Sequence, residues 1–319
     1  MTVSHYLQEL DGLPSFDFPE READGTLPDA ASVAWRLSTP TYCDEGDEQW
    51  EQRFARFVEA VDTTRVRALI VGGWDEAYET SSAGIVEALV GAKDEFPALE
   101  AVFLGDMLSE DCEISWIVQS DVTPLLAAYP RLTTLGVRGS TELAFPPVRH
   151  EGLRRLVVET GGLPAALVRD IAACDLPALE HLELWLGTDW YGGDSTPGDL
   201  EPVLAGDRLP ALRYLGLRNC VTQDAVAAAV AGAPVVARLA ELDLSMGTLT
   251  DAGGQALLDG QRSLAHLKRL DLSHHYLSEE MSERIVAALA PHGVDVDVAD
   301  RQQPDEYDGE LNRYTAVGE

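Results

Sequence analysis

The feature that most constrains the fold of this chain is a short apolar pattern that recurs along most of its length. Each copy has three apolar residues, of which the second follows the first by three positions and the third follows the second by two. Successive copies lie 21 to 33 residues apart. The eight copies contain RVRALIVGG at 65, PALEAVFLG at 97, PRLTTLGVR at 130, EGLRRLVVE at 151, PALEHLELW at 177, PALRYLGLR at 210, ARLAELDLS at 237 and AHLKRLDLS at 265. A repeat of this size indicates a solenoid of stacked units.

Each copy predicts a short strand followed by a returning helix. The alternation in x-L-x-L sends the leucines to one side of a strand and the intervening residues to the other. The residues between strands are enough for a turn and a helix, so neighbouring strands would pair in parallel. In the later copies, Leu239, Leu242, Leu244 and Leu249 are followed by TDAGGQALLDG. This pattern resembles the ribonuclease-inhibitor-like class of leucine-rich repeats. The predicted fold class is therefore α/β, a leucine-rich-repeat solenoid (horseshoe) with a parallel concave sheet and a helical convex side.

The ends of such a solenoid need caps, because a terminal repeat would otherwise expose its apolar side. Residues 1–64 are expected to form an N-terminal arm with a capping strand and helix. Val33, Trp35 and Leu37 alternate like an edge strand, and EQWEQRFARFVEAV has the pattern of an amphipathic helix. The acidic stretch from Phe16 to Asp29 is expected to be an extended arm.

The rest of the chain divides into the solenoid and a C-terminal cap. Residues 65–293 would form the solenoid of about eight repeats, and residues 294–319 a capping strand and tail. We expect the tail to fold over the last repeat through Tyr307, Leu311 and Tyr314.

The charge of the chain limits its partners. The formal net charge is −32, from 55 acidic and 23 basic residues. Such a chain repels nucleic acid and anionic lipid at long range, so neither is expected as a partner. It would attract a protein with a basic surface, although the charge could equally serve solubility alone.

Composition also predicts the compartment. The first residues, MTVSHYLQEL, lack a secretion signal, and no apolar run is long enough to span a membrane. The four cysteines have no paired spacing, as is typical of reduced thiols. We expect a cytoplasmic protein, and a monomer.

Some segments outside the repeat pattern are distinctive. They are SWIVQSDVTPLLAAYPRL at 115, ETGGLP at 159, LEHLELWLGTDWYGG at 179 and the terminal RYTAVGE. With these segments the whole chain resembles a bacterial, mainly actinobacterial, family of cytoplasmic leucine-rich-repeat proteins. That resemblance supports the fold and implies no catalytic residues.

The strand positions that face away from the core are expected to line the concave binding surface of the solenoid. These positions are small and apolar in the first repeats, aromatic and charged in the middle, and acidic at the end. An aromatic side chain surrounded by charges resembles an interaction hot spot. We therefore predict a partner-binding site centred on Trp185, with Glu159, Glu183, Tyr214 and Arg218 around it. Arg138 and His181 occupy equivalent positions beside it.

Loops rich in aromatic residues follow several strands and would emerge on one rim of the solenoid. GGWDEAYET carries Trp74, a later loop carries Trp116, and GTDWYGGDSTPGD carries Trp190 and Tyr191. Long loops of this kind commonly bind a partner. The other interpretation is that Trp116 and Trp190 only fill the irregular repeats.

Asp243, Asp271 and Asp297 recur at one repeat position and would form an acidic ladder. Neighbouring carboxylates about 5 Å apart repel one another unless a cation intervenes. A divalent cation or a basic peptide could supply it, or the face could simply be solvated with arginines such as Arg269 as neighbours.

Catalytic signatures are missing from the sequence. It has no G-x-S-x-G motif, catalytic-cysteine motif or P-loop, and the adjacent His274 and His275 would point to opposite sides of a strand. We expect no enzyme activity, no cofactor and no resident metal. The predicted function is a non-catalytic protein-binding scaffold or regulatory protein. The alternative is an accessory component that binds a small molecule or divalent cation at the loop rim or the acidic ladder.

Overall fold

The computed structural model describes residues 3–21, 26–44, 46–307 and 309–318. The chain divides into two compact units, an N-terminal unit (Thr2–Val158) and a C-terminal unit (Glu159–Gly318). Both are built from alternating strands and helices, and together they contribute twelve strands of mostly parallel sheet. The boundaries predicted at residues 64 and 293 fall inside these units.

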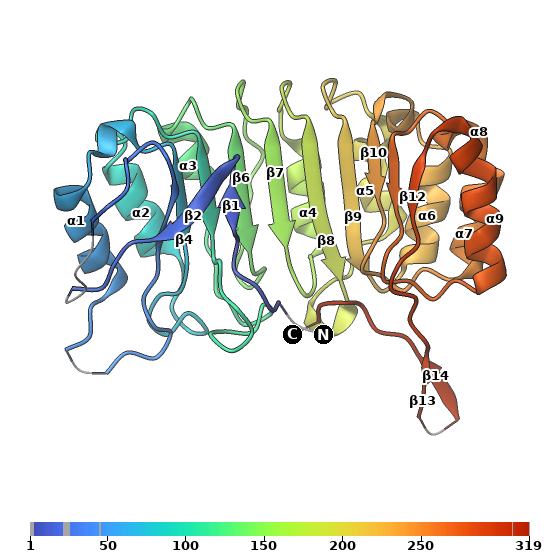
Figure 1. Cartoon of the computed structure of the whole chain (residues 1–319), viewed down its shortest axis with the longest axis horizontal. Coiled ribbons are helices and arrows are strands. Elements are labelled where there is room, and N and C mark those ends of the chain that lie inside the picture. The colour runs from blue at the N-terminus through green and yellow to red at the C-terminus, as the bar shows by residue number, and fades with distance from the viewer. Residues whose placement is uncertain (1–2, 22–25, 45, 308, 319) are drawn as a thin grey trace. The chain divides into compact units, whose positions relative to one another are not determined.

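The N-terminal unit contains a sheet whose strands lie in chain order (Figure 1). The antiparallel pair β1 and β2 starts it, and β2 through β6 run parallel. The elements are β1 (Glu9–Leu10), β2 (Leu13–Asp17), β3 (Ala34–Leu37), α1 (Trp50–Ala60), β4 (Ala68–Val71), α2 (Ala83–Gly91), β5 (Ala101–Leu104), α3 (Thr123–Ala128), β6 (Thr134–Arg138) and β7 (Arg155–Glu159), with a 3-10 turn at Thr63–Arg65.

The C-terminal unit repeats the same alternation with longer strands at its start. Strands β8 to β12 are parallel and in chain order, and an antiparallel hairpin, β13–β14, follows. The strands and helices are α4 (Ala165–Ala173), β8 (His181–Gly187), α5 (Pro197–Ala205), β9 (Tyr214–Cys220), α6 (Gln223–Ala231), β10 (Glu241–Asp243), α7 (Asp251–Asp259), α8 (Gln261–Leu264), β11 (Arg269–Asp271), α9 (Glu279–Leu289), β12 (Asp295–Asp297), β13 (Asp305–Tyr307) and β14 (Glu310–Asn312). The 3-10 turns are η2 (Asp189–Tyr191), Pro234–Arg238 and Ala290–His292.

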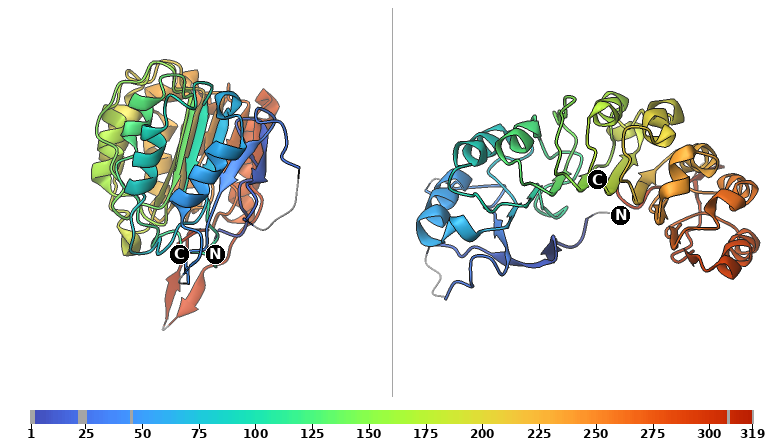
Figure 2. Two further views of the ribbon diagram at one scale, coloured as in Figure 1. Left: turned by 90° about the vertical axis from the view of Figure 1, so that its left-hand side faces the viewer. Right: turned by 90° about the horizontal axis from the view of Figure 1, so that it is seen from above.

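The repeated leucines form the core of each unit, as the pattern predicts. Leu182, Leu215, Leu242 and Leu270 stand opposite one another on adjacent strands, and all four are fully buried. In the N-terminal unit, Trp35, Leu69, Val102 and Leu135 have the same register and burial. Helices cover this leucine side of the sheet, and we call the opposite side of each unit its helix-free face (Figure 2).

Local sequence sets where the helices begin. Thr196 and Asp199 form a capping box at α5, and the side chains of Thr250 and Ser278 accept backbone N–H groups at the starts of α7 and α9. The predicted amphipathic capping helix is α1, which buries Trp50, Phe54 and Phe57.

Three expectations about the strands and helices were wrong. Strand β3 is not an edge strand, because β2 pairs with it on one side and β4 on the other. The expected extended arm begins inside β2, while residues 22–25 of it lie outside the described residues. In addition, no helix occurs among residues 139–154, between β6 and β7, where successive copies of the pattern are only 21 residues apart.

Candidate functional site

The helix-free face of the N-terminal unit is covered by the start of its own chain. Ala68, Ile70, Ala101 and Phe103 were expected to line a binding surface, but they are buried in one apolar cluster with Leu10. Leu7 and Leu13 also pack against this cluster. Figure 2 shows β1 and β2 lying over the sheet on the side away from the helices. The expected binding surface is therefore unavailable in this unit.

A buried carboxylate anchors this covering segment. Asp106 is fully buried and accepts hydrogen bonds from Arg36 Nη2 at 2.7 Å and Arg138 Nη1 at 3.2 Å. The backbone N–H of Leu7 donates to the same carboxylate at 3.1 Å. Arg138 was predicted to bind a partner, but it is 3% exposed and instead pairs with Asp106 inside the unit.

The helix-free face of the C-terminal unit carries a polar network centred on Glu183. Trp185 Nε1 and Arg218 Nη1 donate to one of its carboxylate oxygens at 2.9 and 2.6 Å. His181 Nε2 lies 3.3 Å from the other oxygen. Most of the predicted cluster is thus brought together. However, Glu183 and Trp185 are 5% and 8% exposed, so they support the face from below and offer a partner little contact area.

Tyr214 and His181 form the more accessible part of the same network. Their rings stack with centroids 3.8 Å apart and planes inclined by 3°. The hydroxyl of Tyr214 donates to Asp243 at 2.9 Å. Gly216 leaves room for this ring, because a Cβ there would lie 3.0 Å from Tyr214 Cε1. The sequence therefore sets a flat aromatic platform over a glycine.

The two carboxyl groups of this network differ in acidity. Burial would raise the pKa of Glu183, but hydrogen bonds from His181 and Trp185 and the charge and hydrogen bond of Arg218 together lower it to about 2. Burial raises the pKa of Asp243 despite the nearby charge of Arg218. Burial and the two carboxylates also raise the pKa of Tyr214, so its hydroxyl stays protonated and can keep donating to Asp243.

The predicted acidic ladder exists as a register. Asp243, Asp271 and Asp297 stand opposite one another on β10, β11 and β12. Each uses one oxygen to accept the backbone N–H two residues later, from Ser245, Ser273 and Ala299, at 2.9 to 3.0 Å. The recurrence of aspartate therefore has a local cause, because each carboxylate ends its own strand.

Arginines supply the positive charge between these carboxylates. Arg269 lies 2.9 Å from Asp271, 2.8 Å from Asp297 and 3.0 Å from Asp295, while Arg218 Nε lies 3.2 Å from Asp243. Within the described residues, no group of three or more His, Cys, Asp or Glu side chains is arranged to hold a metal ion.

The loops after the strands divide into packed and exposed aromatic residues. Trp74 is buried, and its Nε1 donates to the carbonyl of Thr80 at 2.7 Å. Trp116 and Trp190 are 56% and 89% exposed, so neither fills a gap between repeats. Tyr191 is half-buried, and its ring lies 3.6 Å from where a Cβ on Gly318 would be.

Glycine pairs let some of these loops pack backbone against backbone. A Cβ on Gly162 would lie 2.3 Å from the carbonyl oxygen of Tyr191, and one on Gly187 would lie 2.0 Å from that of Gly161. Gly193 closes the same loop by donating to the carbonyl of Thr188. Glycines in this loop therefore have a packing role.

The C-terminal tail lies along the strand ends of the C-terminal unit, and one of the three predicted residues, Tyr314, contacts the last repeat through its backbone. The hydroxyl of Tyr276 accepts from the N–H of Tyr314 at 2.9 Å and donates to its carbonyl at 3.0 Å. The side chains of Leu311 and Tyr314 are exposed, and that of Tyr307 lies outside the described residues. A second contact comes from buried Asn219, which binds both backbone groups of Val317, at 2.9 and 2.6 Å. This clamp has no repeat signature and was missed, as were Arg36 and Asp106.

The remaining reactive groups have structural surroundings. His275 accepts from the N–H of Leu277 and lies 3.0 Å from the carbonyl of Val298, and burial lowers its pKa. Burial also raises the pKa of Cys112 to about 11 and raises that of Cys220, so neither is a thiolate at neutral pH. Glu159 is buried at the end of β7.

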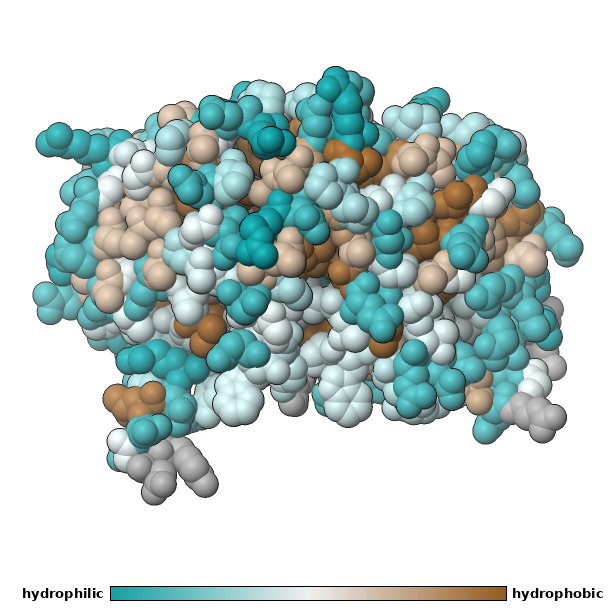
Figure 3. Space-filling model, turned by 180° about the vertical axis from the view of Figure 1, so that it is seen from behind, coloured by the Kyte–Doolittle hydropathy of each residue, from teal (hydrophilic) through white to brown (hydrophobic). Residues whose placement is uncertain are grey.

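The helix-covered side offers less chemistry. Figure 3 shows this side, where apolar patches alternate with hydrophilic side chains. A groove between α5 and α6 also lies on the helices, and its lining includes Leu204, Ala205, Ala229 and one carboxylate, that of Glu201. No helix in the described part of the chain has the length and apolar character to cross a bilayer.

Comparison with known proteins places this architecture in a family. A crystal structure of a Bacteroides fragilis protein, determined as a structural genomics target, matches with a TM-score of 0.76 and 31% sequence identity. The match covers 85% of this chain and 74% of that one. The chain belongs to the same family as that protein. No family model and no curated protein matched. The relationship thus extends to the repeating α/β fold and brings no catalytic or ligand-binding residues with it.

Proposed function

We propose that the chain is a leucine-rich-repeat protein of the ribonuclease-inhibitor-like class, within the bacterial, mainly actinobacterial, family that its sequence resembles. Support comes from the eight-fold leucine pattern, its exact recurrence of register in β8 to β12, and the kinship with a bacterial protein of the same architecture. In this proposal the sheets line the concave side of a horseshoe.

We further propose that it is a non-catalytic scaffold or regulatory protein, monomeric and cytoplasmic, that binds a protein with a basic surface. The binding surface would be the helix-free face of the C-terminal unit. The main support for this proposal is that the chain covers the helix-free face of the N-terminal unit and leaves that of the C-terminal unit open. The equivalent face of the N-terminal unit is buried under residues 7–13, whereas His181, Tyr214 and Arg269 remain partly exposed.

Charge supports the choice of partner. Six carboxylates on strands β8 to β12 face two guanidinium groups, leaving a net charge of −4 on this face. They are Glu183, Glu241, Asp243, Asp271, Asp295 and Asp297, against Arg218 and Arg269. A surface of this sign increases the association rate of a basic partner and suppresses acidic ones.

The stacked pair of His181 and Tyr214 gives the face an anchor that charge alone lacks. Aromatic side chains with surrounding charges are enriched among the residues that dominate binding energy. The pair is held flat by hydrogen bonds to Glu183 and Asp243, so little side-chain freedom remains to be lost when a partner binds.

Crosslinking and co-purification from the native host tests the proposal with two matched charge reversals. Asp295→Lys changes an exposed carboxylate at the end of the helix-free face, and Glu283→Lys makes the same change on the helix α9. We expect the same basic protein to be recovered with the wild type and Glu283→Lys, and at least about tenfold less with Asp295→Lys. Equal recovery with both variants would place binding elsewhere, and recovery of an acidic partner would contradict the charge argument.

A further inference from the structure

A pocket lies at the end of the C-terminal unit, apart from the proposed protein-binding face. Its volume is about 510 Å³. The walls come from loops after three successive strands, with Thr250 after β10, Tyr276 after β11 and Arg301 after β12. Arg313, which follows the β13–β14 hairpin, closes another side. Pockets of this size accommodate small organic molecules.

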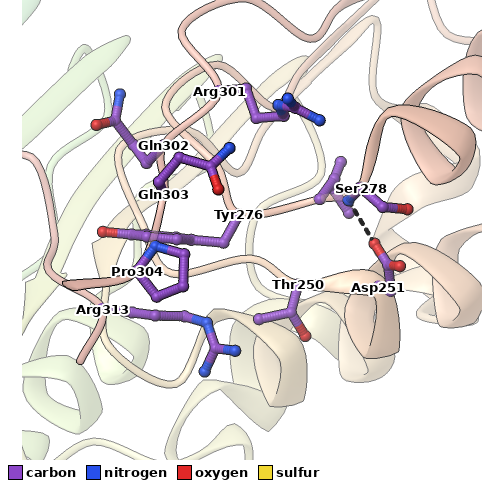
Figure 4. Close-up of a pocket in the computed structure, with 10 residues that line it drawn as sticks. Thr250, Asp251, Tyr276, Ser278, Arg301, Gln302, Gln303, Pro304 and Arg313 are labelled. Carbon is purple, nitrogen blue, oxygen red and sulfur yellow. Dashed lines mark hydrogen bonds between the residues drawn. The ribbon is translucent and has the colours of Figure 1, made fainter. Parts of the chain in front are cut away.

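The charges around this pocket are unusual for such an acidic chain. Arg301 and Arg313 lie on opposite sides of it (Figure 4). Arg218 and Arg269 in the same unit pair with carboxylates, but neither Arg301 nor Arg313 forms an ion pair with a described side chain. Arg313 instead lies over the ring of Tyr276, with its Cζ 6.0 Å from the centroid. Two guanidinium groups are therefore available to a ligand.

One wall of this pocket carries a carboxylate in place of a guanidinium group. Asp251 uses one oxygen to accept the backbone N–H of Ser278 at 2.7 Å, which leaves its second oxygen able to accept from a ligand. The hydroxyl of Ser278 accepts from Met281 at the start of α9, so its proton can also be donated. The pocket thus offers cationic donors on two sides and a single carboxylate acceptor on a third.

We propose that this pocket binds a small hydroxylated polyanion, with two anionic groups facing Arg301 and Arg313 and a hydroxyl group donating to Asp251. Di- and tricarboxylates and sugar bisphosphates share this chemistry. Guanidinium groups bind carboxylate and phosphate through paired hydrogen bonds, so both kinds of anionic group fit. A monoanion could satisfy only one of the two arginines. This inference is independent of the proposed protein partner.

Isothermal titration calorimetry tests the proposal with citrate, fructose 1,6-bisphosphate and acetate. Work at roughly 0.15 M ionic strength shortens the Debye length to about 8 Å, so distant carboxylates no longer repel the probes. We expect saturable binding of at least one polyanion and none of acetate. Arg301→Gln and Arg313→Gln should each weaken it about tenfold, which corresponds to 1.4 kcal/mol.

Arg262→Gln, at another exposed arginine, on α8, is the matched control and should bind like the wild type. Because all three arginines are exposed, unchanged thermal unfolding without ligand would show that the variants fold. Equal affinity in all variants, or acetate binding as tightly as the polyanions, would overturn the assignment. So would the lack of any binding by either polyanion at about 10 mM, well above a weak dissociation constant of about 1 mM.

Discussion

The two units treat the helix-free face of the same kind of sheet in opposite ways. In the N-terminal unit the outward positions of β4 and β5 are small or apolar, and the chain's own first strands cover them. In the C-terminal unit the corresponding positions carry His181, Tyr214, Arg269 and several carboxylates, which remain partly exposed. The comparison teaches that one repeat pattern can produce either a second buried layer or a polar surface. The residues between the leucines decide which.

Both units place an aromatic ring beside a glycine on the helix-free face. Phe103 lies over Gly136 in the N-terminal unit, and Tyr214 lies over Gly216 in the C-terminal unit. The first ring is buried beneath Leu10, while the second keeps a hydroxyl bonded to Asp243. A glycine beside an aromatic residue therefore sets a ring flat on the sheet in both units, and only its surroundings differ.

Removing the charge that anchors the covering segment should have the largest effect. Asp106→Ala would leave Arg36 and Arg138 buried without their shared partner, and we expect a loss of about 3–5 kcal/mol in the free energy of unfolding. Urea denaturation measures it. Asp94→Ala, at a carboxylate whose side chain is 89% exposed, should change stability by less than about 0.5 kcal/mol. Similar losses in both variants would contradict the anchoring role.

Loosening the cover itself should have a smaller and more local effect. Leu10→Ala removes the apolar contact with Ile70 and Phe103, and we expect about 2–3 kcal/mol of destabilisation. Hydrogen exchange at the N–H of Ser15, which donates to the carbonyl of Gln8, should become faster. Glu9→Ala, at an exposed neighbour, should leave that rate unchanged. Unaltered exchange in Leu10→Ala would mean that the cover is held without this leucine.

Acid should affect the C-terminal face through Glu183. Its pKa is about 2 in the folded chain against 4.5 as the ordinary value, so its charge stabilises the fold above pH 4.5 and loses that effect as pH falls. Between about pH 5 and pH 3 the wild type should lose about 2 kcal/mol more than Glu183→Gln. Asp243, whose pKa is raised, contributes with the opposite sign. Urea titrations of both proteins at the two pH values measure the difference, and parallel losses would contradict it.

The smallest expected effects come from substituting alanine for Gly136 or Gly216, the glycines beside the two aromatic rings. Alanine at Gly136 would place its Cβ 2.2 Å from Phe103 Cδ2, in a buried cluster, and should cost about 1–3 kcal/mol. Alanine at Gly216 meets Tyr214 at 3.0 Å, a much milder approach than 2.2 Å, so we expect less than about 1 kcal/mol. Urea denaturation of the two variants decides this order. A larger loss at Gly216 would contradict the order expected from the two distances.

The core was predictable because it depends on local alternation. Each x-L-x-L segment determines which of its own residues point inward, and the fixed repeat then aligns Leu215, Leu242 and Leu270 across the sheet. The amphipathic pattern of α1 and the N-caps of α7 and α9 are equally local. These features needed no knowledge of distant contacts.

The candidate site was predictable only in part, because it also depends on contacts between residues that are distant in the sequence. Alternation placed Glu183 and Trp185 on the helix-free face, but it could not show that they hydrogen-bond to each other and are nearly buried. The covering of the N-terminal face joins Leu7 to Asp106, 99 residues away, and no repeat spacing encodes such a contact. The small residues Ala68 and Ala101 at surface positions were the available signal.

The aspartates that end β10, β11 and β12 bear on how such a protein can change in length. Each closes its strand with a bond to its own chain two residues later, so this bond is formed within a single repeat. The spacing of 28 residues from Asp243 to Asp271 thus marks one module of the repeat. Duplication or loss of such a module in the gene would add or remove one strand and one helical layer, and would leave the fully occupied N-terminal unit unchanged. Natural variation in this family is therefore expected as gain or loss of whole repeats within the C-terminal unit.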